Sequence, residues 1–202
     1  AEDNAVINRM GFNNAGQAEA MVRLGNLTRD KGAGPIGVNI GANKDSEDRI
    51  ADYVTGVRNM EPYADYLTIN ISSPNTPGLR ALQDKAALDD LLARAIAARQ
   101  QDMPVFLKVA PDLEPADIDD IVDVSIKRGI AALIVSNTTI SRPELKSRYA
   151  GESGGLSGAP LRDLAQQRLV DFRKASGGGI PLVGVGGISS ARDAYARIRA
   201  GA

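Results

Sequence analysis

Short apolar runs and longer amphipathic segments alternate along most of the chain. The runs are rich in β-branched residues and predict strands at residues 36–40, 66–71, 105–109, 132–136 and 182–185. Segments with helical periodicity follow them at residues 46–60, 85–101, 115–128, 161–175 and 190–200, and an earlier helix is predicted at residues 17–31. The second of these segments carries an apolar stripe with a 3.6-residue spacing, at Leu88, Leu91, Leu92, Ala95 and Ile96.

Strand–helix alternation of this kind predicts a parallel sheet with right-handed crossovers. Polar or glycine residues gather where each strand ends, at Asn39, Asn70 with Ser73, Lys108, Asn137 with Thr138, and Gly186 with Gly187. An open doubly wound sheet concentrates its chemistry at one switch point, whereas a (β/α)8 barrel collects it from all strand ends. The distribution therefore favours a (β/α)8 TIM-type barrel.

A complete barrel has eight strands and usually about 250 residues. The 202-residue chain provides only about five strands of this pattern, begins in what reads as a loop, and stops where another strand is due. We therefore expect residues 1–202 to be one partial barrel domain that lacks the first strands and the last strand.

The amino-acid composition excludes several kinds of partner and catalytic group, but it says little about the fold. The net charge is −1 without any basic tract, so nucleic acid is not an expected partner, and the longest apolar run, at 130–135, is too short to span a membrane. The chain contains no His and no Cys, so an imidazole base, thiolate chemistry and cysteine-ligated metals are excluded within it. The acidic sequence Asp112-Leu113-Glu114 is interpreted as carboxylates at a helix start, and no metal is expected.

Asparagines recur in predicted loops and strand ends, at Asn8, Asn39, Asn70, Asn75 and Asn137. A carboxamide offers an acceptor and two donors in one plane, which suits the edge of a planar, pyrimidine-like ligand. Any single one of them has a simpler explanation, because asparagine favours turns and caps. Amides at the ends of three separate strands favour a binding site.

Lys108 interrupts an otherwise apolar strand, and an inward-facing lysine needs an anionic partner or its pKa falls. Three interpretations stay open: a phosphate or flavin partner, a Schiff-base nucleophile as in lysine aldolases, or a structural ion pair.

Ser73 lies in a segment stiffened by Pro74 and Pro77, with Gly78 permitting a turn. Such a segment can hold one hydroxyl in place as a base, although an ordinary Ser/Pro turn would have the same composition. The glycines at 154–158 and 184–187 either cradle a phosphate or allow close packing.

Seven motifs together, in this order and spacing, resemble the quinone-linked (class 2) dihydroorotate dehydrogenases over essentially the whole chain. They are Asn8-Arg9-Met10-Gly11-Phe12-Asn13-Asn14, Gly37-Val38-Asn39-Ile40-Gly41, Asn70-Ile71-Ser72-Ser73-Pro74-Asn75-Thr76-Pro77-Gly78-Leu79-Arg80, Leu107-Lys108-Val109-Ala110-Pro111-Asp112-Leu113, Ser136-Asn137-Thr138-Thr139, Gly154-Gly155-Leu156-Ser157-Gly158 and Gly184-Val185-Gly186-Gly187-Ile188. The resemblance implies a (β/α)8 barrel that uses FMN to oxidise (S)-dihydroorotate to orotate in pyrimidine (UMP) biosynthesis and passes the electrons to a membrane quinone.

The resemblance also implies site roles, with Ser73 as the base; the family's soluble classes have cysteine there. Substrate contacts are implied for Asn8, Arg9, Met10, Gly11, Phe12, Asn70, Asn75, Asn137 and Thr138. FMN contacts are implied for Asn39, Asn70, Lys108, Ser136, Gly158 and Gly187. Ser136 departs from the family's usual threonine but keeps the hydroxyl. The family's N-terminal membrane extension, which contacts the quinone, is not in this sequence. Peripheral attachment to the cytoplasmic face of the cell membrane is therefore an expectation from resemblance alone, and no obligate protein partner is expected.

Two other functions remain as alternatives. In the first, the segment by itself is a non-catalytic fragment. In the second, the barrel is a lysine Schiff-base aldolase that uses Lys108.

Overall fold

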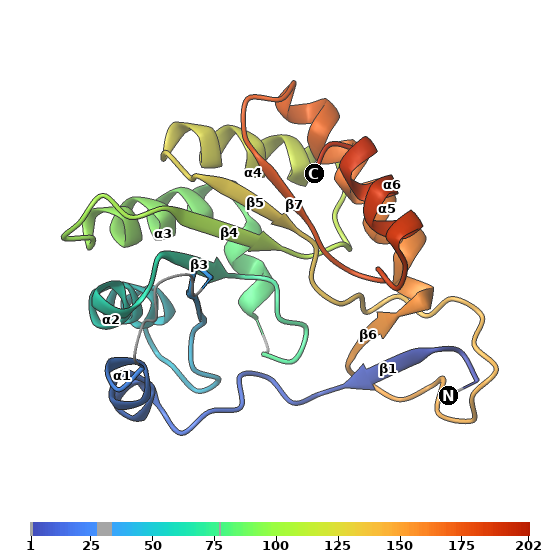
Figure 1. The fold of residues 1–202 in the computed structure, drawn as a ribbon, viewed down its shortest axis with the longest axis horizontal. Helices are drawn as coiled ribbons and strands as arrows, with labels where there is room; N and C mark the ends of the chain where they lie inside the picture. Colours follow the sequence, from blue (N-terminus) through green and yellow to red (C-terminus); the bar gives the residue numbers. More distant parts are fainter. Residues whose placement is uncertain (1, 28–33, 77) are drawn as a thin grey trace.

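The computed structural model describes residues 2–27, 34–76 and 78–202. Its main feature is a parallel sheet with the strand order β2-β3-β4-β5-β7 (Figure 1). The strands are β2 (Gly37–Ile40), β3 (Tyr66–Asn70), β4 (Val105–Val109), β5 (Ala132–Val135) and β7 (Leu182–Gly184). All five strands that the sequence predicted are therefore confirmed, with β4 at the predicted bounds and the others shorter by one residue.

Six α-helices alternate with these strands in the described part of the chain. They are α1 (Gln17–Gly25), α2 (Arg49–Met60), α3 (Lys85–Ala97), α4 (Pro115–Lys127), α5 (Arg162–Ser176) and α6 (Ala191–Arg199). Short 3-10 turns add η1 (Glu61–Tyr63), η2 (Leu79–Gln83) and η3 (Ala159–Leu161). Each helix was predicted, but several ends were wrong: α2 begins after its N-cap Asp48 rather than at 46, and α3 ends before 101. Residues 28–31 of the first predicted helix lie outside the described residues.

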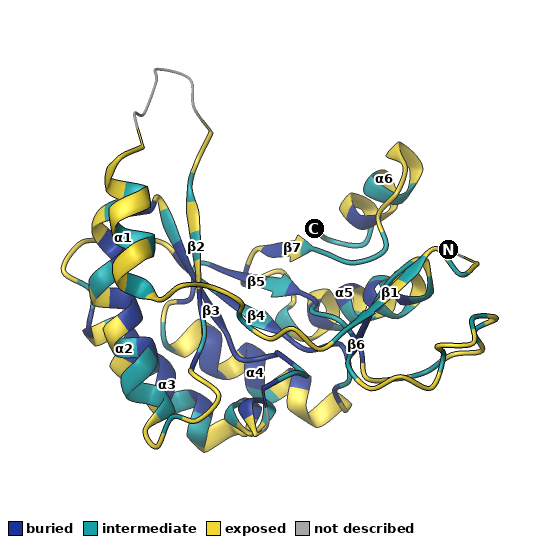
Figure 2. Ribbon diagram, turned by 90° about the horizontal axis from the view of Figure 1, so that it is seen from below, coloured by how far each residue is buried: buried dark blue, intermediate teal, exposed yellow. Residues whose placement is uncertain are grey.

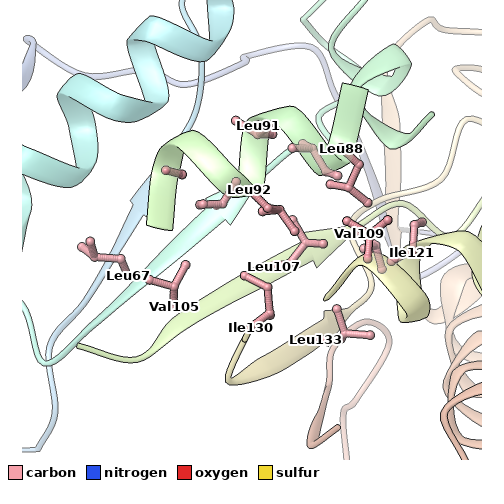
Figure 3. Close-up of a cluster of buried hydrophobic side chains, with 14 of the residues drawn as sticks. Leu67, Leu88, Leu91, Leu92, Val105, Leu107, Val109, Ile121, Ile130 and Leu133 are labelled. Atoms are coloured by element: carbon pink, nitrogen blue, oxygen red, sulfur yellow. The ribbon is translucent and has the colours of Figure 1, made fainter. Parts of the chain in front are cut away.

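The two faces of the sheet have different partners. Along β4, Val105, Leu107 and Val109 are buried, whereas the alternate residues Phe106 and Lys108 are only partly buried. Figure 3 shows the first set packed with the leucines of α3 and with Ile121 of α4. The helices therefore cover one face, and Phe106 and Lys108 point to the other, which we call the inner face.

A two-stranded antiparallel ribbon was missed. Strand β1 (Ala5–Asn8) pairs with β6 (Gly155–Gly158), with Ala5 opposite Gly158 and Asn8 opposite Gly155. Residues 2–4 form a turn, as expected, but neither the strand at residues 5–8 nor the strand at residues 155–158 was predicted. Glycine is required in β6, because a Cβ on Gly158 would lie 2.4 Å from the Asn4 carbonyl oxygen.

The architecture is that of a partial (β/α)8 barrel with five parallel strands and their helices. Figure 2 shows β3, β4 and β5 buried along much of their length, whereas α1, α6 and β1 are mostly exposed or intermediate. None of the helices in the described ranges has the length and apolar character needed to cross a membrane.

Candidate functional site

Two of the predicted asparagines, Asn39 and Asn70, share the inner face of the sheet with Lys108. Asn70, the last residue of β3, pairs in register with Lys108 of β4. Asn39 pairs with Thr68, two residues earlier along β3, so it lies on the same face but inside its strand rather than at its end. Tyr53 of α2 donates a hydrogen bond of 2.7 Å to the Asn70 carbonyl oxygen and fixes the end of β3. This role of Tyr53 was not predicted from the sequence.

Ser72 connects two of these amides. Its hydroxyl donates to Asn70 Oδ1 at 2.8 Å and accepts from Asn137 Nδ2 at 3.0 Å, and its backbone N–H also donates to Asn70 Oδ1, at 3.2 Å. Asn137 Oδ1 in turn accepts from the backbone N–H of Thr138 at 2.8 Å. Ser72 is fully buried, so these contacts hold both side-chain amides in one orientation.

Ser73 is buried beside this cluster, and its hydroxyl is less engaged. Ser73 Oγ accepts one hydrogen bond, from the backbone N–H of Asn75 at 3.3 Å. The Asn75 side chain donates to Asn8 Oδ1 at 3.1 Å, which joins the serine segment to the end of β1. Gly155 of β6 has no room for a Cβ, which would lie 2.1 Å from Thr138 Oγ1 and 3.0 Å from Pro74 Cγ. Pro77, which was expected to stiffen the segment, lies outside the described residues.

Lys108 has no counter-charge within the described ranges, where its ammonium makes neither an ion pair nor a hydrogen bond. Burial lowers the pKa of Lys108 from its ordinary value. The structural ion pair, one of three interpretations of this lysine, is therefore wrong for the described chain. A phosphate or flavin partner and a Schiff-base role both remain open.

Asp112 was assigned to a helix start, and that assignment was wrong. It accepts a hydrogen bond from Arg80 Nη1 at 2.8 Å, a second from the Thr139 hydroxyl and a third from the backbone N–H of Ile140 at 3.1 Å. Glu114 is the residue that caps α4, in a reciprocal pair with Asp117. No group of three or more acidic side chains in the described residues has the arrangement of a metal site.

Of the segment from Asn8 to Phe12, only Asn8 forms a hydrogen bond with the described residues around Ser72 and Ser73, through Asn75. Arg9 Nη1 forms an ion pair with Glu152 at 2.8 Å, and the Met10 side chain is exposed. Phe12 packs against Gly41 after β2, where a Cβ would lie 2.4 Å from its ring. A cleft of about 690 Å³ runs between this segment, the end of β2 and the serine segment; its lining includes Arg9, Met10, Gly11, Phe12, Asn39, Lys44 and Asn75. This volume is typical of small-molecule sites.

Gly158 and Gly187 lie near the start of α5. Gly158 is the N-cap of η3, which leads directly into α5, and a Cβ on Gly187 would lie 2.6 Å from Arg162 Cα. The close-packing interpretation of both glycines is therefore correct, and it leaves the phosphate interpretation open. The backbone N–H groups of Gly186 and Gly187 have no acceptor among the described residues. Ser136, just beyond β5, donates from its hydroxyl to the Asn137 carbonyl oxygen at 3.3 Å.

Comparison with known proteins agrees with this geometry. A family model described as dihydroorotate dehydrogenase matches residues 1–202. The chain belongs to the dihydroorotate dehydrogenase family. Two curated members, both named dihydroorotate dehydrogenase (quinone), are 64% identical (Sphingopyxis alaskensis) and 66% identical (Erythrobacter litoralis) over the whole chain. Similarity to such members identifies the chain as a segment of the quinone-linked class.

The chain spans 57% and 59% of the length of these two dihydroorotate dehydrogenases. Solved structures of the family agree with the fold. The structure of DHODH in complex with ferulenol from Eimeria tenella matches 99% of this chain with a TM-score of 0.94 at 38% identity, and 61% of that chain is covered. The ligand-free structure from the same organism gives a TM-score of 0.94 at 40% identity, with 62% of that chain covered.

Proposed function

We propose that this chain forms the substrate- and flavin-facing part of an enzyme that oxidises (S)-dihydroorotate to orotate with FMN and passes the electrons to a quinone. In this proposal the reaction belongs to pyrimidine (UMP) biosynthesis. The observation that carries it is the geometry beyond the ends of β3 and β5. The buried Ser73 follows Ser72, which orients two amides, and one of these, Asn70, pairs in register with Lys108, which has no counter-charge in the described ranges. The quinone-linked relatives support it independently.

The amides suit the polar edge of a planar ring. Both the hydroxyl and the backbone N–H of Ser72 donate to Asn70 Oδ1. Asn70 Nδ2 has no acceptor in the described chain, so it can donate to a ligand. Asn75, which lines the cleft, donates to Asn8 Oδ1, and Thr138 follows Asn137 just beyond β5. We assign substrate binding to these five residues and to Arg9, Met10, Gly11 and Phe12. Fixed amide dipoles orient the ring and stabilise charge that develops on its carbonyl groups.

Ser73 is assigned as the base that takes a proton from the substrate. No histidine or cysteine exists in the chain to compete for this role. The N–H group of Asn75 points at Ser73 Oγ, and a donor in that position stabilises negative charge on the oxygen. Burial of the hydroxyl removes competing water.

The residues on the inner face fit FMN. Lys108 offers an unpaired ammonium, which would match the anionic or carbonyl-rich edge of a flavin, and Asn39, Asn70 and Ser136 offer neutral polar groups around it. The free N–H groups at Gly186 and Gly187 and the nearby Gly158 suit a phosphate close to the start of α5. When bound, FMN would supply the hydride acceptor.

The quinone enters this proposal through the names of the relatives, and the membrane enters it only through the resemblance to the family. We infer peripheral attachment of the full-length protein to the cytoplasmic face of the cell membrane, through an N-terminal extension. Attachment is tested by sedimenting the full-length protein with and without membranes. Recovery of all the protein in the supernatant in both conditions would contradict it.

Ser73→Ala in the full-length protein tests the base. We expect flavin reduction by dihydroorotate to slow by about 10²–10⁴-fold or more, because the variant lacks the group that accepts the proton. FMN content should remain normal. The matched control is Ser125→Ala, which removes a buried hydroxyl near the C-terminal end of α4. Near-normal flavin reduction in Ser73→Ala would remove this serine from the role of base.

The lowered pKa of Lys108 also suits a Schiff-base aldolase. Borohydride treatment of the full-length protein with carbonyl substrates discriminates between the two functions. Covalent trapping on Lys108 in a colourless protein would favour the aldolase, whereas yellow protein with flavin absorbance and no trapping favours the dehydrogenase.

A further inference from the structure

The serine segment is held in place from its far end by Arg80. This residue lies in η2 and reaches back over the segment, where its guanidinium donates to the Ser72 carbonyl oxygen at 3.4 Å. The same guanidinium donates to Asp112 Oδ2 at 2.8 Å and to the Thr138 carbonyl oxygen at 3.2 Å. One side chain therefore joins the loops that follow β3, β4 and β5.

Asp112 is equally well connected. Its carboxylate accepts from Arg80, from the hydroxyls of Thr139 and Ser141, and from the backbone N–H of Ile140. Burial raises the pKa of Asp112, but the hydrogen bonds from Thr139, Ile140 and Arg80 outweigh it and bring the pKa below its ordinary value. The carboxylate is therefore ionised near neutral pH and remains a partner for Arg80.

This ion pair is less exposed than most in the described chain, with side-chain exposures of 21% for Arg80 and 14% for Asp112. The Asp89–Arg128 pair between α3 and α4 has similar geometry, with exposures of 28% and 30%. The helix pair lies on the outer layer, whereas Arg80 and Asp112 lie among the loops that carry Ser73, Asn137 and Thr138. A charged pair spanning those loops is well placed to control their relative positions.

We propose that Arg80 and Asp112 are positioning residues for the oxidation: the ion pair holds residues 72–76 against the ends of β3 and β5, so that Ser73 stays buried and aligned. The inference rests on the proposed function for its kinetic consequence. Arg80 is assigned a positioning role because its guanidinium donates to Ser72, Asp112 and Thr138, and so acts through the loops that it joins. Its removal leaves the Asp112 carboxylate and the carbonyl oxygens of Ser72 and Thr138 without their shared donor.

The experiment uses the full-length flavoprotein and two independent measurements. The first is the rate of flavin reduction by saturating dihydroorotate in a stopped-flow instrument, for wild type, Arg80→Ala, Arg80→Lys and Asp112→Asn. We expect a decrease of about 10–100-fold for Arg80→Ala, the range that loss of a charge-assisted hydrogen-bond network produces. Arg80→Lys should recover part of this loss, because lysine keeps the ion pair but not the fork that reaches both carbonyl groups. Asp112→Asn keeps the size of the side chain and should also be slower than wild type.

The second measurement does not depend on activity. This chain has no cysteine, so Ser73→Cys introduces a thiol whose reaction rate with a small thiol reagent reports how often the segment opens. We expect labelling to be about tenfold faster or more when Arg80→Ala is added. The parent protein without the new cysteine gives the background.

Arg128→Ala is the matched control, since it breaks an ion pair of the same type between helices; it should leave both measurements within about twofold of the parent. A wild-type protein that does not reduce its flavin with dihydroorotate refutes the proposed function and leaves the labelling result to decide the role of the pair. An active wild type with an unchanged Arg80→Ala rate refutes the positioning role, and so does unchanged labelling. FMN content near one per chain in each variant verifies that the comparison is between folded proteins.

Discussion

Ser72→Ala should uncouple the two amides that face the proposed substrate. In the structure the Ser72 hydroxyl donates to Asn70 Oδ1 and accepts from Asn137 Nδ2, and its exposure to solvent is 0%. Alanine fills almost the same space, so the change removes two hydrogen bonds and little else. The Asn70 oxygen keeps one donor, the backbone N–H of residue 72, whereas Asn137 Nδ2 loses its acceptor.

The magnitude follows from what remains unpaired. Asn137 is half-buried and its freed Nδ2 can be partly solvated, so we expect the free energy of unfolding to fall by about 1 kcal/mol, the low end of the range for an unpaired buried polar group. Ser125→Ala is the matched control, because Ser125 is also fully buried but its hydroxyl has no hydrogen-bond partner in the described structure. Removal of an unsatisfied hydroxyl loses no bond, and Ser125→Ala should leave the stability unchanged or slightly higher.

Two assays on the full-length protein test this reasoning. Urea titration gives the shift in midpoint at constant slope, and orotate titration of the flavin spectrum gives the affinity for the product. For Ser72→Ala we expect a lower midpoint and an affinity about tenfold weaker, since about 1.4 kcal/mol of amide orientation must be restored on binding. Equal midpoints and equal orotate affinities for the two variants would show that the Ser72 bonds contribute nothing, and the account of amide orientation would fail.

The remaining predictions concern the cofactor. Gly187→Ala should reduce FMN content, measured by absorbance after purification, because residue 187 has φ +68° and its Cβ would lie 2.6 Å from Arg162 Cα; normal content would contradict the close-packing argument. Lys108→Met should weaken FMN binding by about tenfold or more, since hydrogen bonds to charged groups contribute about 1.5–3 kcal/mol, yet stabilise the cofactor-free protein. The pKa of Lys108 is lowered in the folded chain, so the unfolded chain binds more protons between the two pKa values. The stability of the cofactor-free wild type should therefore rise with pH as the pH approaches 10.5, and Lys108→Met should lack this part of the rise in denaturant titrations at several pH values.

The parallel sheet was predictable because its strands bury one whole face against helices. Leu67, Leu107 and Leu133 are each 0% exposed. The apolar segments that contain them are recognisable in the sequence as buried strands. The β1–β6 ribbon was not predicted, because its strands are four residues each and pair across about 150 positions. Ala5-Val6-Ile7 was a usable signal for β1, but its partner Gly155-Leu156-Ser157-Gly158 has a composition typical of loops. Non-local pairing made that segment a strand.

In the candidate site, too, some residues were predicted correctly from the sequence and others were not. Asn70 and Lys108 were placed correctly, because the register of a parallel sheet brings the ends of neighbouring strands together. Asp112 was misassigned, because in the sequence it precedes a helix that begins with Pro115, and its actual partners lie 32 residues before it and 27 residues after it. Sequence patterns near a helix start predict which residue caps that helix. They do not predict which distant arginine forms an ion pair with a carboxylate.

Two adjacent serines show what the structure adds to the sequence. In the sequence alone, Ser72 and Ser73 are equivalent candidates for a hydroxyl base. In the structure, both side chains are buried. Ser72 already uses its hydroxyl hydrogen and an acceptor site to hold two asparagines, and its carbonyl oxygen to meet Arg80. Ser73 accepts a single backbone hydrogen bond, and its hydroxyl donates to no acceptor in the described chain. A group that must exchange a proton with a ligand needs that unused capacity, whereas a group that orients its neighbours needs every bond it makes. Hydrogen-bond capacity therefore separates the two proposed roles: Ser72 orients the amides, and Ser73 keeps the unused donor that the proposed base requires.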